Sequence, residues 1–82
     1  MTDKQWNKYA DEGMKAASNK ITEALVKKYP ISKWKEKQEE ARKTLERRRK
    51  SGYYENKPDA ALKDWTDLYI ARIICYQDAN RM

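Results

Sequence analysis

The chain has 82 residues, which is enough for one domain with a thin core. Charged residues make up 39% of it, the net charge is +6, and it contains no histidine and one cysteine. This composition excludes a histidine general base, a cysteine–histidine nucleophile and a zinc site, and a chain with two glycines has no Gly-rich phosphate loop. We therefore expect a non-catalytic protein without cofactor or metal.

The first predicted helix covers residues 3–28. Thr2 or Asp3 can cap its start, and small or apolar side chains recur along it at three-to-four spacing. Gly13 lies in the middle of this face, where it lowers helix propensity. Together with the neighbouring alanines it forms a low stripe that lets another helix approach closely, which favours packing over function. Pro30 ends the helix, because proline disfavours helical geometry at the residue before it.

The second predicted helix covers residues 33–50, with Ser32 as its cap and Gly52 just past its end. Its apolar seam is thin, because it contains only Trp34, Ala41 and Leu45 as apolar positions. Residues 30–50 carry nine basic and four acidic groups, so nearly all of the excess charge of the chain lies here.

A loop from Gly52 to Lys57 leads to the third predicted helix, 58–79, which begins favourably with Pro58. From Leu68 to Tyr76 this helix is apolar nearly all round, which indicates a central helix or one that shares a face with another chain. The sequence thus predicts an all-α fold with a single domain, 1–82, either a three-helix antiparallel bundle or a helical hairpin plus a third helix.

Two interpretations of the basic helix remain open. It is either an electrostatic docking face or a solvated face whose charges pair within the helix, as Glu39–Lys43 and Glu46–Lys50 would. A docking face would bind a protein partner with an acidic or amphipathic surface, a nucleic acid or anionic lipid. The candidate partner-binding residues are the basic set Lys35, Arg42, Lys43, Arg47, Arg49 and Lys50, the aromatic pair Tyr53 and Tyr54, and the apolar pair Ile70 and Ile74.

Arg72 is unusual because it lies within the apolar arc of the third helix. A buried guanidinium must be paired, so we expect either a salt bridge to Glu12 or Glu23 or contact with a partner or anion. Two alternatives are also open for Ile70 and Ile74. They are either buried under the loop after Gly52 or part of a face for self-association or for a partner.

No segment is long and apolar enough for a transmembrane span, and the first residues lack the apolar core of a signal peptide, so we expect a cytoplasmic location. This frame of 82 residues, with helices around Trp34–Leu45 and Pro58–Ala79, resembles the small accessory proteins of tailed phages, in particular the cytoplasmic antiholins of T-even phages. The resemblance implies a regulator that binds the cytoplasmic part of a holin and delays lysis from the host cytoplasm. Anti-CRISPR proteins are similar in style. No family site residues can be transferred.

Overall fold

The computed structural model describes residues 2–80 and is all-α, with no strand in this part of the chain. Three long helices are joined through two short ones. In chain order they are α1 (Asp3–Lys20), α2 (Glu23–Lys28), α3 (Ile31–Ser51), α4 (Tyr53–Asn56) and α5 (Pro58–Asn80).

Several helix ends follow the predicted chemistry. Thr2 caps α1 in a capping box: its hydroxyl accepts the Gln5 backbone N–H at 3.2 Å, and the Gln5 side chain accepts the Thr2 N–H at 3.1 Å. Gly52 ends α3 in the left-handed region, with φ at 78°. Pro58 is the first residue of α5, as predicted.

The prediction of one continuous helix over 3–28 is wrong, because the chain breaks at Ile21 and Thr22. Both residues adopt extended backbone angles, and the Thr22 hydroxyl accepts the Leu25 N–H at 3.1 Å, which caps α2. Short hydroxyl side chains compete with helical hydrogen bonding in this way, and the β-branched pair has weak helix propensity.

Two further boundaries differ from the prediction. The helix α3 begins at Ile31 with Pro30 as its N-cap, so Ser32 lies inside the first turn instead of capping it. The Pro30 carbonyl accepts the N–H groups of Lys33 and Trp34, which starts the helix without a side-chain cap. The expected loop after Gly52 contains the short helix α4, which leaves few residues in an irregular conformation.

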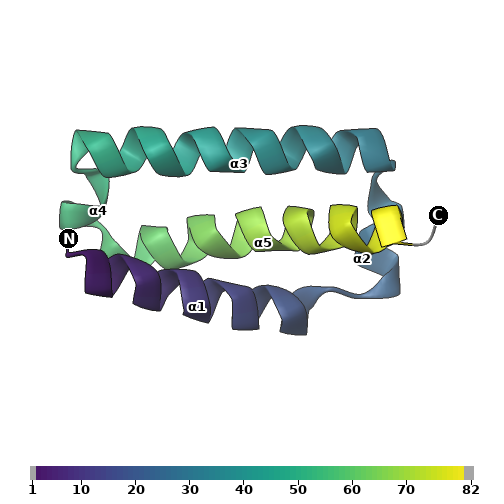
Figure 1. Ribbon diagram of the computed structural model, residues 1–82, viewed down its shortest axis with the longest axis horizontal. Helices are drawn as coiled ribbons and strands as arrows, with labels where there is room; N and C mark the ends of the chain where they lie inside the picture. The colour runs from purple at the N-terminus through teal and green to yellow at the C-terminus, as the bar shows by residue number, and fades with distance from the viewer. Residues whose placement is uncertain (1, 81–82) are drawn as a thin grey trace.

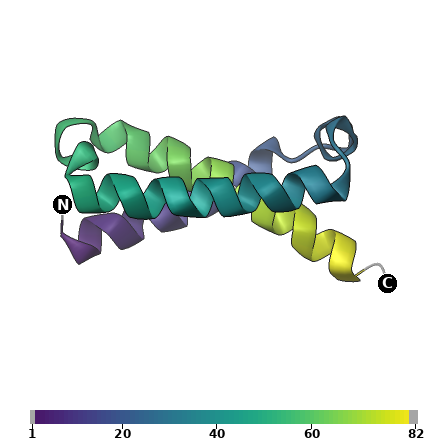
Figure 2. The ribbon, with the colours of Figure 1, turned by 90° about the horizontal axis from the view of Figure 1, so that it is seen from above.

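Helix α5 is the central element of the bundle, as its apolar middle predicted. Both α1 and α3 pack along it. Helix α3 runs antiparallel to α1 and α5, and it lies between the viewer and these two helices when the bundle is seen from above (Figures 1 and 2). Beneath it, α1 and α5 cross each other in Figure 2.

Gly13 marks a close approach between α1 and α5. A Cβ atom at this position would lie 2.6 Å from the Cβ of Trp65 and 3.1 Å from the Thr66 backbone nitrogen. Gly13 is buried, and Ala17, one turn further along, is fully buried. The low stripe predicted from the sequence is therefore confirmed at these two positions, and it serves helix packing.

The buried side chains form two clusters. The first, called here the α4-end core, contains Leu45, Tyr54, Ala61 and Leu68, with Trp6 and Trp65 packed against it. The second, the α2-end core, contains Trp34, Ala71 and Ile74, and side chains of the 21–31 segment cover it. Helix α2 has no buried residue of its own, and the Trp34 indole N–H ties it down by donating to the Val26 carbonyl at 3.1 Å.

Candidate docking surface

The charge of α3 is concentrated in its C-terminal half. Residues 31–41 contain three basic and three acidic side chains, whereas residues 42–51 contain six basic and one acidic, a net charge of +5. Cations in the last turn of a helix also complement the negative end of its dipole. The sequence predicted that the excess charge lies on this helix. Within the helix, the excess positive charge lies on ten residues at the end of the bundle that carries α4 (Figure 1).

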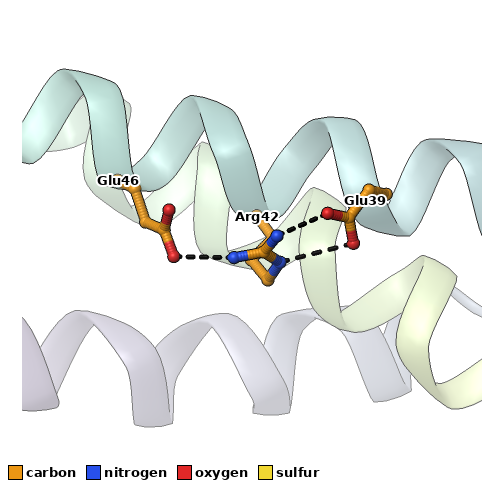
Figure 3. Close-up of polar contacts among 3 residues, drawn as sticks. All are labelled: Glu39, Arg42 and Glu46. Atoms are coloured by element: carbon orange, nitrogen blue, oxygen red, sulfur yellow. Dashed lines mark hydrogen bonds and ion pairs between the residues drawn. The ribbon is translucent and has the colours of Figure 1, made fainter.

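Arg42 is held between two glutamates and contributes little free charge. Its guanidinium binds both oxygens of Glu39 and donates to Glu46 Oε1 at 2.8 Å (Figure 3). The hydrogen bond from Arg42 lowers the pKa of the Glu39 carboxyl. The predicted pairs of these glutamates with Lys43 and Lys50 are therefore wrong, because Arg42 can bridge both acids with its planar fork.

Arg48 and Arg49 are also engaged within the bundle. Arg48 Nη1 lies 2.8 Å from Asp64 Oδ2, and Arg49 Nη2 lies 2.7 Å from Asp3 Oδ1. Their guanidinium carbons lie over aromatic rings, each 4.6 Å from the ring centroid, of Tyr53 and Trp6 respectively. Cation–π contacts of this kind hold the guanidinium against the protein surface, so these cations join α3 to its neighbours.

Three cations of this half remain unengaged. Lys43, Arg47 and Lys50 are exposed and take part in no ion pair within residues 2–80. Their spacing of four and then three residues places them on one side of α3, opposite its buried seam. We call this set the free basic face. Lys35 is also exposed, but it lies in the neutral half of the helix, two turns before Lys43.

Two of the predicted partner-binding side chains are buried, and two more are only half-exposed. Tyr54 is 2% exposed and Ile74 is 2% exposed, so both predictions are wrong and both residues are core. Tyr53 is half-buried beneath Arg48 and Lys57, and Ile70 is half-buried against the α2-end core. The choice left open for Ile74 is settled as burial, although the covering elements are α2 and α3 and not the loop after Gly52.

Arg72 is exposed, so the prediction of a buried charge is wrong. Its guanidinium carbon lies 5.6 Å from the Tyr69 ring centroid, and it forms no salt bridge with Glu12 or Glu23. Ala71 and Ile74 of this helix are buried in the core, whereas Arg72 faces outward. The apolar arc counted along the sequence was too wide, because Leu68, Ala71 and Ile74 are buried whereas Tyr76 is 69% exposed.

Asp64 is the structural site that sequence reasoning missed. It is 9% exposed, and its Oδ2 atom accepts hydrogen bonds from the Tyr54 hydroxyl at 2.7 Å and from Arg48 at 2.8 Å. The hydrogen bond to Asp64 raises the pKa of Arg48. The available signal was its place three residues after Ala61 and four before Leu68, on the buried side of α5.

This network predicts a loss of stability at alkaline pH. Burial, and then the hydrogen bond to Asp64, raise the pKa of the Tyr54 phenol above its ordinary value. An unfolded chain ionises this phenol near pH 10 and the folded chain does not, so the stabilisation is complete below about pH 10 and is lost as the pH rises further. Urea unfolding at several pH values should show wild type losing about 1 kcal/mol more than Tyr54→Phe between about pH 9 and 11. Parallel curves for the two proteins would contradict this.

Comparison with protein-family models, with curated proteins and with solved structures gave no match. Among the described residues, none of the helices combines the length and the apolar character that crossing a membrane requires. The same residues contain no group of three or more side chains placed to hold a metal ion.

Proposed function

We propose that this chain is a non-catalytic, stoichiometric binding protein that docks on an acidic face of a protein partner. The observation that carries the proposal is the free basic face. Of the six cations in the C-terminal half of α3, three are held by carboxylates of the same chain, while Lys43, Arg47 and Lys50 point outward without one. Complementary charge of this kind steers encounter and fixes orientation at protein interfaces.

The geometry favours a protein over a nucleic acid. Trp34 is 5% exposed and Tyr54 is 2% exposed, so neither can stack on a base, which is how single strands are commonly held. Glu36, Glu39 and Glu40 occupy the other half of the helix and would repel a phosphate backbone running along it. A short patch of three cations suits a compact acidic surface better than a long polyanion.

The resemblance to cytoplasmic antiholins supplies one specific partner class for this proposal. On that basis the partner is the cytoplasmic part of a holin, and the bound protein acts as an inhibitor that delays lysis from within the host cytoplasm. This part of the proposal rests on the resemblance, whereas the free basic face supports only a partner with an acidic surface.

A nucleic-acid-binding module is the second candidate, because a net charge of +5 within ten residues is a dense positive patch. Binding to generic DNA and RNA across a range of salt concentrations separates the two candidates. Affinity that falls steeply with salt and disappears when the free basic face is reversed would assign the surface to nucleic acid and overturn the proposal of a protein partner.

The matching protein experiment uses a partner captured from the source cell, purified, and titrated by calorimetry. We expect a fixed stoichiometry, and we expect the triple variant Lys43→Glu, Arg47→Glu, Lys50→Glu to weaken binding by more than about tenfold. The control reverses three exposed lysines of α1, Lys4→Glu, Lys8→Glu and Lys15→Glu, which changes the net charge equally. Equal weakening in both variants would show that only net charge matters and would overturn the assignment to α3.

A further inference from the structure

A groove of about 440 Å³ runs between α3 and α5. Its walls are α3 from Trp34 to Thr44 and α5 from Asp64 to Ile70. Leu25 and Tyr29, from α2 and the residue after it, close one end. The groove is therefore built from all three parts of the fold that meet around the α2-end core.

The lining of the groove divides into an apolar and an acidic part. Leu25, Trp34 and Ile70 supply apolar surface toward the α2 end. The charged side chains of the lining are the carboxylates of Glu40, Asp64 and Asp67 and the ammonium of Lys37. The Lys37 ammonium lies 4.6 Å from the centroid of the Tyr29 ring, so it is directed to the closed end of the groove. Arg48, which lies outside the lining, is paired with Asp64, so Glu40 and Asp67 against Lys37 leave an excess of one negative charge.

The carboxylates of the groove have unused capacity to accept hydrogen bonds. The Asp64 side chain is 11% exposed, and both of its hydrogen bonds, from Tyr54 and Arg48, go to Oδ2, so Oδ1 accepts none within residues 2–80. Asp67 lies one turn further along α5, and in the same part of the chain neither it nor Glu40 forms an ion pair. The network with Tyr54 and Arg48 fixes the Asp64 carboxylate, which keeps its second oxygen in a defined place.

We propose that this groove binds an elongated organic cation, an alkylammonium or alkylguanidinium, with its charged head at Asp64 and Asp67. Its methylene chain would lie along Trp34 and Ile70, which matches the apolar part of the lining. Charge-assisted hydrogen bonds to two carboxylates give the head its orientation, and burial of the chain contributes about 0.8 kcal/mol for each methylene group. An anion is disfavoured by the three carboxylates, and an uncharged apolar ligand would remove water from them without replacing it.

The test is a titration of the whole chain with hexylamine and with hexylguanidine, followed by nuclear magnetic resonance. The indole N–H of Trp34 reports on the groove, while those of Trp6 and Trp65, in the α4-end core, serve as internal references. We expect a saturable shift of the Trp34 signal with a dissociation constant below about 1 mM, and no such shift with hexan-1-ol, which has the same chain without the charge.

Two variants identify the head-group site. Asp67→Asn should weaken hexylamine binding by about tenfold, whereas Asp59→Asn, the same change at an exposed position of α5 outside the groove, should alter it less than about twofold. Asp67 is exposed, so its replacement is not expected to unfold the protein. The proposal is overturned if the Trp34 signal does not move at about 10 mM amine, if hexan-1-ol binds equally, or if both aspartate variants behave alike.

A further ligand distinguishes the source of the cation. If Nα-acetyl-lysine methylamide binds as tightly as hexylamine, the groove accepts a basic side chain of another polypeptide. If the backbone-bearing compound binds at least about tenfold more weakly, the groove is selective for a free amine or guanidine. Both results support the cation site, and neither depends on the free basic face of α3.

Discussion

Replacing Gly13 with alanine is expected to destabilise the protein by about 2 kcal/mol, although alanine favours an exposed helix by about 1 kcal/mol over glycine. The added methyl group would lie 2.6 Å from the Cβ of Trp65 and 3.1 Å from the Thr66 backbone nitrogen. Neither atom is the free end of a flexible side chain, so α1 and α5 must move apart. That movement separates Ala17 and Trp6 from their contacts on α5, and overpacking of this kind exceeds the gain in helix propensity.

Urea unfolding followed by far-UV circular dichroism measures this effect. The matched control is Asn7→Ala, an exposed position of the same helix, where the change in propensity acts alone and should be neutral or stabilising by up to about 0.5 kcal/mol. A Gly13→Ala variant as stable as wild type would show that α1 and α5 do not approach each other at this point.

Replacing Asp64 with alanine is expected to cost about 3 kcal/mol of stability, the sum of two unequal losses. The larger loss is the Tyr54 hydroxyl, which is left without an acceptor in the α4-end core, where the residue is 2% exposed. The smaller is the ion pair with Arg48, whose side chain is 33% exposed and can partly recover water.

A double-mutant cycle with Tyr54→Phe separates the two losses. Because phenylalanine removes the unpaired hydroxyl, the double variant should be more stable than the sum of the single effects predicts, with a coupling of about 1 kcal/mol or more. Asp11→Ala, at an exposed position of α1, should change stability by less than about 0.5 kcal/mol. Strictly additive effects in the cycle would mean that the Tyr54–Asp64 hydrogen bond does not stabilise the fold.

The fold class and the long helices could be predicted from the sequence because they depend on local patterns. Few glycines and prolines, a capping threonine and Gly52 after a basic run were sufficient to predict three long helices. The break at Ile21 and Thr22 could not be found in this way. A threonine inside a helix and a threonine that caps a new one have the same sequence context, and tertiary packing on the α2-end core selects the second.

The candidate site was predicted only at the level of the helix that carries it. Net charge identified α3, but which cations remain free depends on carboxylates from other helices, such as Asp3 for Arg49 and Asp64 for Arg48. The same limit explains Arg72 and Ile74, whose burial is determined by how α5 is rotated between α1 and α3. That rotation depends on packing between helices, which periodicity within one helix cannot reveal.

The uneven charge of α3 gives the molecule a local positive patch near one end of its 39 Å axis, where residues 42–51 carry a net charge of +5. Such a patch attracts an acidic surface at short range, and the rate of productive association through it would fall as added salt screens the field. The groove between α3 and α5 extends toward the opposite end, past these charges. A partner captured by the basic end would thus leave the groove open to solvent, and the two surfaces could be occupied at the same time.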